Sequence, residues 1–126
     1  MSKQAINTAN APAAVGPYSQ GVKAGDLVFV SGQLPMTPEG DLITDDVSAA
    51  AKRSLQNVSA VLKAAGASMS DVVKVTVFLA DMDDFAAMNE VYKEFFAEPF
   101  PARAAVAVKT LPKGAPLEIE AIAVVS

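Results

Sequence analysis

An eight-residue run of mostly β-branched and apolar residues, VVKVTVFL at Val72–Leu79, separates two stretches of the chain that have helical spacing. In residues 46–65 before it, and in residues 85–95 after it, apolar side chains recur every three or four positions. That spacing is typical of an amphipathic helix, whereas a short β-branched run is typical of a strand. The chain is therefore predicted to form a helix, a strand and a second helix in that order.

Both predicted helices have residues that can begin and end them. Asp46 can cap the first helix with its carboxylate, and Gly66 can end it. Asp83 or Asp84 can cap the second helix, and Pro99 can end it.

The remaining segments predict further strands around the two helices. Residues 27–31, 103–109 and 117–125 are extended apolar runs bounded by turn-forming residues, and a shorter run precedes the KAGD turn at 23–26. Residues 1–16 have no clear period and are predicted to form an irregular arm.

This order of elements, β-β-α-β-α-β-β, predicts one α+β domain that covers residues 1–126. We expect a single sheet in which the strand at 117–125 pairs with the strand at 103–109. Helical crossovers between parallel strands are right-handed, which places both helices on the same face of the sheet. The other face is then uncovered and partly apolar, so it is predicted to be a subunit interface.

The composition excludes several kinds of catalytic site. The 126 residues include no histidine, cysteine or tryptophan, which excludes a Ser-His-Asp triad, a thiol nucleophile and zinc sites built on His or Cys. The acidic stretches TDDVS and ADMDDF are interpreted as helix starts instead of metal ligands. No GxGxxG or Walker pattern is present, so neither a metal nor a cofactor is expected.

Charge and hydropathy limit the possible binding partners and the expected cellular compartment. A net charge of −4 without a basic cluster disfavours nucleic-acid binding. No apolar run approaches the roughly 20 residues that a membrane span needs, and no secretory signal pattern is visible. The protein is expected to be cytoplasmic.

Arg103, one of only two arginines, stands at the entrance of a strand that otherwise has the sequence of a buried core. It would share a face with Ala105 and Ala107, whose small side chains leave room beside a guanidinium. A buried guanidinium keeps its charge and needs an anion. Glu118 or Glu120 could supply that anion in a structural ion pair, a ligand carboxylate or phosphate could supply it, or the arginine could simply reach solvent.

Glu118 and Glu120 point to one face of their strand. One interpretation is a solvated edge, or a pair of partners for Arg103 and Lys74. The other is that one glutamate forms an ion pair while the second lies near a cleft, where it can orient or deprotonate water.

Two glycine-containing motifs and one helix residue are further candidates. Gly-Pro-Tyr fixes the backbone ahead of the Tyr18 hydroxyl, and Ser31-Gly32 ends a strand with a residue that lets a ligand approach the backbone. Turn chemistry explains both motifs equally well without a site. Asn89, on the second helix, is either a ligand contact or a solvated amide.

Six stretches of the chain, taken together in their order and spacing, resemble one known family. They are GPYSQG (16–21), VSGQLP (30–35), SLQNV (54–58), KVTVFLADMDDFAAMNEVY (74–92), PAR (101–103) and EIEAIAV (118–124). The chain resembles the RidA family of reactive-intermediate deaminases, also called the YjgF family, over nearly its whole length.

The resemblance implies a chorismate-mutase-like fold and a homotrimer with three equivalent clefts between subunits. It also implies hydrolysis of 2-imino acids and their enamine tautomers, such as 2-iminobutanoate and 2-iminopropanoate, to 2-keto acids and ammonia without metal or cofactor. By position in the motifs, Arg103 would hold the substrate carboxylate and Glu118 would be associated with the attacking water. The other matched binding positions are Tyr18, Ser31, Gly32 and Asn89.

The chain departs from the family at Ala105, where many members have a cysteine. The backbone N–H of Ala105 could still bind a carboxylate, but thiol-dependent behaviour is excluded. Two alternatives to imine hydrolysis stay open, because relatives have been described as endoribonucleases that inhibit translation and as ligand-binding regulators without catalysis.

Overall fold

The computed structural model describes residues 2–125, so Met1 and Ser126 lie outside it. In chain order, its strands and α-helices are β1 (Gln4–Ile6), β2 (Gly21–Ala24), β3 (Leu27–Gln33), α1 (Val47–Ala64), β4 (Val72–Leu79), α2 (Phe85–Phe95), β5 (Ala102–Ala107) and β6 (Leu117–Val124). Three single turns of 3₁₀ helix lie at Met69–Asp71, Met82–Asp84 and Pro112–Gly114. No helix within residues 2–125 is both long and apolar enough to span a bilayer.

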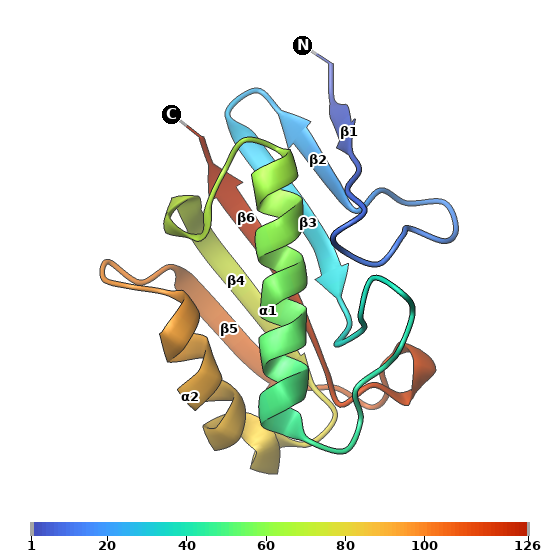
Figure 1. Cartoon of the computed structure of the whole chain (residues 1–126). Helices are drawn as coiled ribbons and strands as arrows, with labels where there is room; N and C mark the ends of the chain where they lie inside the picture. The colour runs from blue at the N-terminus through green and yellow to red at the C-terminus, as the bar shows by residue number, and fades with distance from the viewer. Residues whose placement is uncertain (1, 126) are drawn as a thin grey trace.

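The six strands form one mixed sheet in the order β1-β2-β3-β6-β4-β5. Among neighbouring strands of this sheet, only the pair β4 and β5 is parallel, and the α2 segment is the crossover between these two strands. Both helices lie on the same face of the sheet, with α1 across its middle and α2 toward the β5 end (Figure 1). The predicted α+β fold with two helices on one face is confirmed.

Side chains alternate along each strand between the two faces of the sheet. We call the face that carries α1 and α2 the helix face and the other one the open face. On β4, Val75, Val77 and Leu79 are fully buried, and they pack with fully buried α1 residues such as Leu55 and Leu62 in one core. Successive strand residues point to opposite faces, so the intervening β4 residues belong to the open face, which no helix covers.

The ends of α1 agree with the sequence, and the start of α2 differs from it. The Asp46 carboxylate accepts a hydrogen bond from the Ala49 N–H at 3.2 Å, and Gly66 ends α1 with a positive φ of 81°. Asp84, one of the two predicted caps, is the N-cap residue of α2, but its side chain makes no capping hydrogen bond. The Asp81 carboxylate caps the preceding turn instead, accepting from the Asp83 N–H at 2.9 Å. A 3₁₀ turn precedes α2, so the cap lies earlier than helical spacing alone indicates.

Two expectations about the sheet are wrong. Gln4–Ile6, placed in an irregular arm, form β1, an edge strand antiparallel to β2. The last strand, β6, does not pair with β5, because it lies between β3 and β4 and is antiparallel to both. The strand β1 was missed because three residues are too few to show a period. The pairing of β6 was missed because hydrophobic periodicity predicts which face of a strand is buried and not which strand lies beside it.

Candidate active site

A cavity of about 930 Å³ brings together four of the predicted site residues. Its walls come from the segment before β2, the end of β3 with the loop that follows it, and β6. The four predicted residues that line it are Tyr18, Ser31, Gly32 and Glu118. The tyrosine is exposed, whereas the other three are partly buried.

A β-bulge places Ser31 and Gly32 against Glu118. The pairing of β3 with β6 shifts between Val30 and Gln33, which leaves one extra residue on β3. A Cβ atom on Gly32 would lie only 2.7 Å from Oε2 of Glu118. Glycine is therefore needed here because the carboxylate rests directly on the backbone of the bulge.

Ser31 fastens this bulge to the segment that contains Tyr18. Its hydroxyl donates to the Ser19 carbonyl, and its N–H donates to the Gln20 carbonyl at 3.0 Å. The hydroxyl hydrogen is thus engaged within the chain, and only the oxygen lone pairs can face a ligand. Ser31 positions the cavity wall in addition to any contact that it makes with a ligand.

The environment of Glu118 suits proton transfer. Burial raises the pKa of the Glu118 carboxyl above its ordinary value, and the neighbouring Glu120 raises that pKa further. A carboxyl group with a raised pKa takes up and returns a proton more readily near neutral pH than an ordinary surface glutamate does.

Arg103 lies in a second cluster, on the surface of α2. Its Nη1 donates to Oδ1 of Asn89 at 2.6 Å. Its guanidinium carbon lies 4.7 Å from the centre of the Tyr92 ring and 5.4 Å from the centre of the Phe85 ring. Asn89, for which the sequence left both a ligand contact and a solvated amide open, therefore hydrogen-bonds to the arginine within the chain.

Ala105 is next to Arg103 on the same side of β5, at the edge of the sheet. The Val108 N–H just beyond β5 donates to the Leu79 carbonyl of β4. Because N–H groups alternate in direction along a strand, the N–H of Ala105 points away from β4 to the free edge. This N–H therefore takes no part in the pairing of β5 with β4.

The two clusters lie on opposite faces of the sheet. Arg103 is in register with the buried Val75 on the helix face, whereas Glu118 is in register with Phe78 on the open face. Two strand spacings, about 10 Å, also separate β5 from β6. The expectation that Glu118 or Glu120 pairs with Arg103 on a neighbouring strand is therefore wrong for a single chain.

Within residues 2–125, no carboxylate forms an ion pair with Arg103. In the part of the chain that the structure describes, the only ion pair within 4.0 Å joins Lys93 to Glu90, at 2.7 Å. The guanidinium is exposed and its hydrogen-bond partner is a neutral amide, so its charge is free to attract an external anion.

Two buried amides hold the cavity walls, and the sequence reasoning did not assign them a role. Gln20 is 3% exposed and donates to the carbonyls of Thr8, Ala11 and Pro12, while its own carbonyl accepts from the Thr8 N–H. Asn57 is fully buried, and it donates to the carbonyls of Leu34 and Met36 and accepts two bonds from Arg53. The signal was a polar amide at a core position in each of the motifs GPYSQG and SLQNV.

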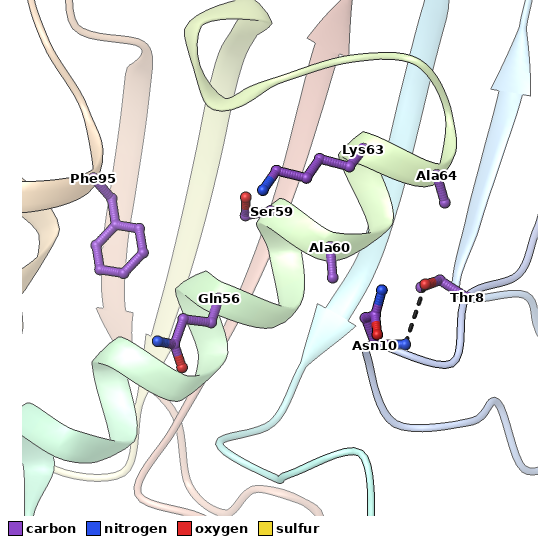
Figure 2. A pocket seen from close by; sticks show the side chains of 8 residues that line it. All are labelled: Thr8, Asn10, Gln56, Ser59, Ala60, Lys63, Ala64 and Phe95. Atoms are coloured by element: carbon purple, nitrogen blue, oxygen red, sulfur yellow. Dashed lines mark hydrogen bonds between the residues drawn. The ribbon is translucent and has the colours of Figure 1, made fainter.

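A second cavity, of about 540 Å³, lies on the outer surface of α1 between the N-terminal segment and Phe95 of α2 (Figure 2). None of the predicted site residues lines it, and its one ionisable lining residue, Lys63, is exposed. It offers no paired acid and base. Residues 2–125 also contain no cluster of three His, Cys, Asp or Glu side chains that could hold a metal ion.

Comparison with known proteins identifies the family. The protein-family model described as Endoribonuclease L-PSP matches residues 8–125. A 2-iminobutanoate/2-iminopropanoate deaminase of Salmonella typhimurium is 53% identical, over 98% of each chain.

Comparison with solved structures identifies the same family. Escherichia coli TdcF with bound serine is 51% identical and superposes with a TM-score of 0.93 over 98% of this chain and 99% of that chain. RidA from the Antarctic bacterium Psychrobacter sp. PAMC 21119 is 50% identical, with a TM-score of 0.93 over 97% of this chain and 99% of that chain. The protein therefore belongs to the family described as Endoribonuclease L-PSP, which is the RidA (YjgF) family of reactive-intermediate deaminases.

Proposed function

We propose that this protein hydrolyses 2-imino acids and their enamine tautomers, with 2-iminobutanoate and 2-iminopropanoate as substrates, to 2-keto acids and ammonia. The observation that carries the proposal is the 53% identity over 98% of the chain to a protein named for that activity. It is supported by an arginine free to bind a carboxylate and by a glutamate whose pKa is raised. We further propose that the protein works in the cytoplasm, where pyridoxal-phosphate enzymes release such imines.

The active form in this proposal is a homotrimer with its sites between subunits. Four apolar residues of the open face, Leu27, Phe29, Val106 and Val124, are each 40–45% exposed in a single chain. Covering this face with further copies would bury them, which favours association. The same association would bring the Arg103 edge of one subunit to the Glu118 cavity of its neighbour.

Substrate binding begins with the carboxylate in this mechanism. The Arg103 guanidinium and the Ala105 N–H of one subunit bind the two carboxylate oxygens. Tyr18, Ser31 and Gly32 of the adjacent subunit form the wall around the imine carbon. Charge-assisted bonds to a planar guanidinium fix both the position and the orientation of the substrate.

Hydrolysis then needs only one placed water molecule and one carboxyl group. Ionised Glu118 accepts a proton as the water oxygen bonds to the carbon of the protonated imine. The resulting carbinolamine takes that proton on nitrogen, the carbon–nitrogen bond breaks, and ammonia leaves. The remaining hydroxyl gives its proton to Glu118, which is ionised again, and becomes the keto oxygen, and Glu118 then releases that proton to the departing ammonia or to solvent. Because a protonated imine is already electrophilic, these residues suffice without a stronger nucleophile.

A coupled assay tests the proposal directly. A threonine dehydratase generates 2-iminobutanoate in the presence of semicarbazide, which traps the imine as it forms. Added protein is expected to lower the yield of semicarbazone and speed the appearance of 2-oxobutanoate. Unchanged trapping over a range of protein concentrations would contradict the proposal.

The family description also names an endoribonuclease, so RNA is the control substrate. The cavity is lined by Glu39, Glu118 and Glu120 and by one cation, Lys113, and this balance repels a phosphate backbone. We expect no RNA cleavage above that of the Glu118→Gln variant.

A further inference from the structure

We propose that Phe85, Asn89 and Tyr92 of α2 form a positioning clamp that holds the Arg103 guanidinium ready for the substrate carboxylate. We call these three residues the α2 clamp. The inference rests on the proposed function, since it gives the clamped arginine the role of carboxylate binding.

The spacing of the clamp residues follows from the helix. Positions 85, 89 and 92 lie on one face of α2, because residues three and four apart are neighbours on a helix surface. From that face, two aromatic rings and one amide oxygen reach the same guanidinium, at 5.4, 4.7 and 2.6 Å. Three contacts from one rigid element restrict the long arginine side chain to one region.

This restriction has a consequence for binding. An exposed arginine has many rotamers, and a ligand that orders it must overcome the lost side-chain entropy. A side chain already held by its own protein avoids most of that loss when the ligand arrives. The clamp would therefore lower KM without taking part in the bond-making steps.

The clamp also leaves the charge of the arginine intact. Aromatic faces attract a cation without cancelling its charge, and Asn89 offers a neutral oxygen. An aspartate at this position would instead form an internal ion pair and compete with the substrate carboxylate. Neutral contacts suit a guanidinium whose anion is supplied from outside the chain.

Tyr92 contributes its ring and not its hydroxyl. The residue is 5% exposed and its ring packs against Phe96 with 4.6 Å between ring centres. In the described part of the chain, the Tyr92 hydroxyl is buried without a hydrogen-bond partner. The ring can therefore be varied electronically at nearly constant shape.

Fluorination of this ring is the test. Tyr92→Phe is the starting variant, and mono-, di- and trifluorophenylalanine are then placed at position 92, because fluorine withdraws the electron density that attracts a cation. We expect Tyr92→Phe to keep the KM for 2-iminobutanoate and trifluorophenylalanine to raise it about fivefold. The value of kcat and the melting temperature should stay constant along the series, and trifluorophenylalanine at Phe95 of the same helix is the matched control.

A second variant tests the charge argument. Asn89→Asp should weaken binding of 2-oxobutanoate, measured by calorimetry, about tenfold or more, whereas Asn89→Gln should weaken it less. A KM that does not change along the fluorine series, or an Asn89→Asp variant with normal affinity, would overturn the clamp. Suppose that the wild-type protein hydrolyses the imine and Arg103→Ala does not. An unchanged KM along the fluorine series, or normal affinity in Asn89→Asp, then refutes the clamp but leaves the proposed function intact. A wild-type protein without activity refutes the proposed function instead.

Discussion

Gly32→Ala should damage catalysis by moving one carboxylate, with little effect on the fold. The added Cβ would lie 2.7 Å from Oε2, 2.8 Å from Cδ and 3.0 Å from Cγ of Glu118. The φ of Gly32 lies outside the region that disfavours alanine, so the backbone itself is not strained. The clash therefore falls on the glutamate side chain.

The size of the effect follows from these distances. To restore an ordinary contact of 3.4 Å, the carboxylate must move by about 0.7 Å. A misplacement of about 1 Å can lower a rate about a hundredfold, so we expect kcat to fall between about tenfold and a hundredfold. The KM should change little, because the proposed mechanism assigns carboxylate binding to Arg103 and not to Glu118.

Steady-state imine hydrolysis in four proteins checks this reasoning: the wild type, Gly32→Ala, Glu118→Gln and the double variant. If Gly32→Ala acts through Glu118, the double variant should be no slower than Glu118→Gln alone. If Gly32→Ala kept the kcat of the wild type, displacement of the Glu118 carboxylate could not be the reason that position 32 requires glycine. A loss that recurs in full in the Glu118→Gln background would exclude that displacement as the cause too, because Gly32 would then act independently of the carboxylate.

Further predictions concern the arginine, the glutamate and the assembly. Arg103→Lys should lower kcat/KM about a hundredfold, nearly as much as Arg103→Ala, because lysine lacks the planar two-donor fork; a lysine variant with near-normal kinetics would contradict this. Since burial raises the pKa of Glu118 and its ionised form acts as the base, activity should fall as pH drops through that raised pKa, and Glu118→Gln should abolish this acid limb. A raised pKa also means that ionisation of Glu118 costs stability, so Glu118→Gln should raise the melting temperature at neutral pH, and the gain should vanish below the ordinary glutamate pKa. Light scattering should give a mass of about three 13.0 kDa chains, and a stable monomer would contradict the proposed assembly.

Local sequence signals predicted most of the fold. Val72–Leu79 and the two helices are long enough to show their periods, so their type is confirmed, while α1 is shorter than predicted by one residue at each end and α2 ends at Phe95, before Pro99. Strand pairing could not be derived in this way, because the position of β6 between β3 and β4 depends on contacts far apart in the chain. The bulge at Ser31–Gly32 was missed for the same reason, since an extra residue is visible only against the partner strand.

The sequence supplied candidate residues for the site, but their arrangement in space could not be derived from it. Motif positions named Arg103, Glu118 and Asn89, but the sequence did not indicate that the first two face opposite sides of the sheet. Nor did it show that Asn89 binds the arginine, because helix and strand meet there only in the folded chain. The buried amides Gln20 and Asn57 look like ordinary polar residues until their burial is known.

In the proposed assembly, Arg103 of one subunit and Glu118 of another complete each site, and mixed trimers distinguish this arrangement from a site within one chain. Arg103→Ala and Glu118→Gln proteins, each strongly impaired when assayed alone, are unfolded together, refolded at equal amounts and assayed for hydrolysis of 2-iminobutanoate. If the two residues come from different subunits, random mixing should leave both intact in about one site in four and restore about a quarter of wild-type activity. If a single chain supplied both residues, every site would lack one of them. Mixed trimers without activity would therefore contradict the account.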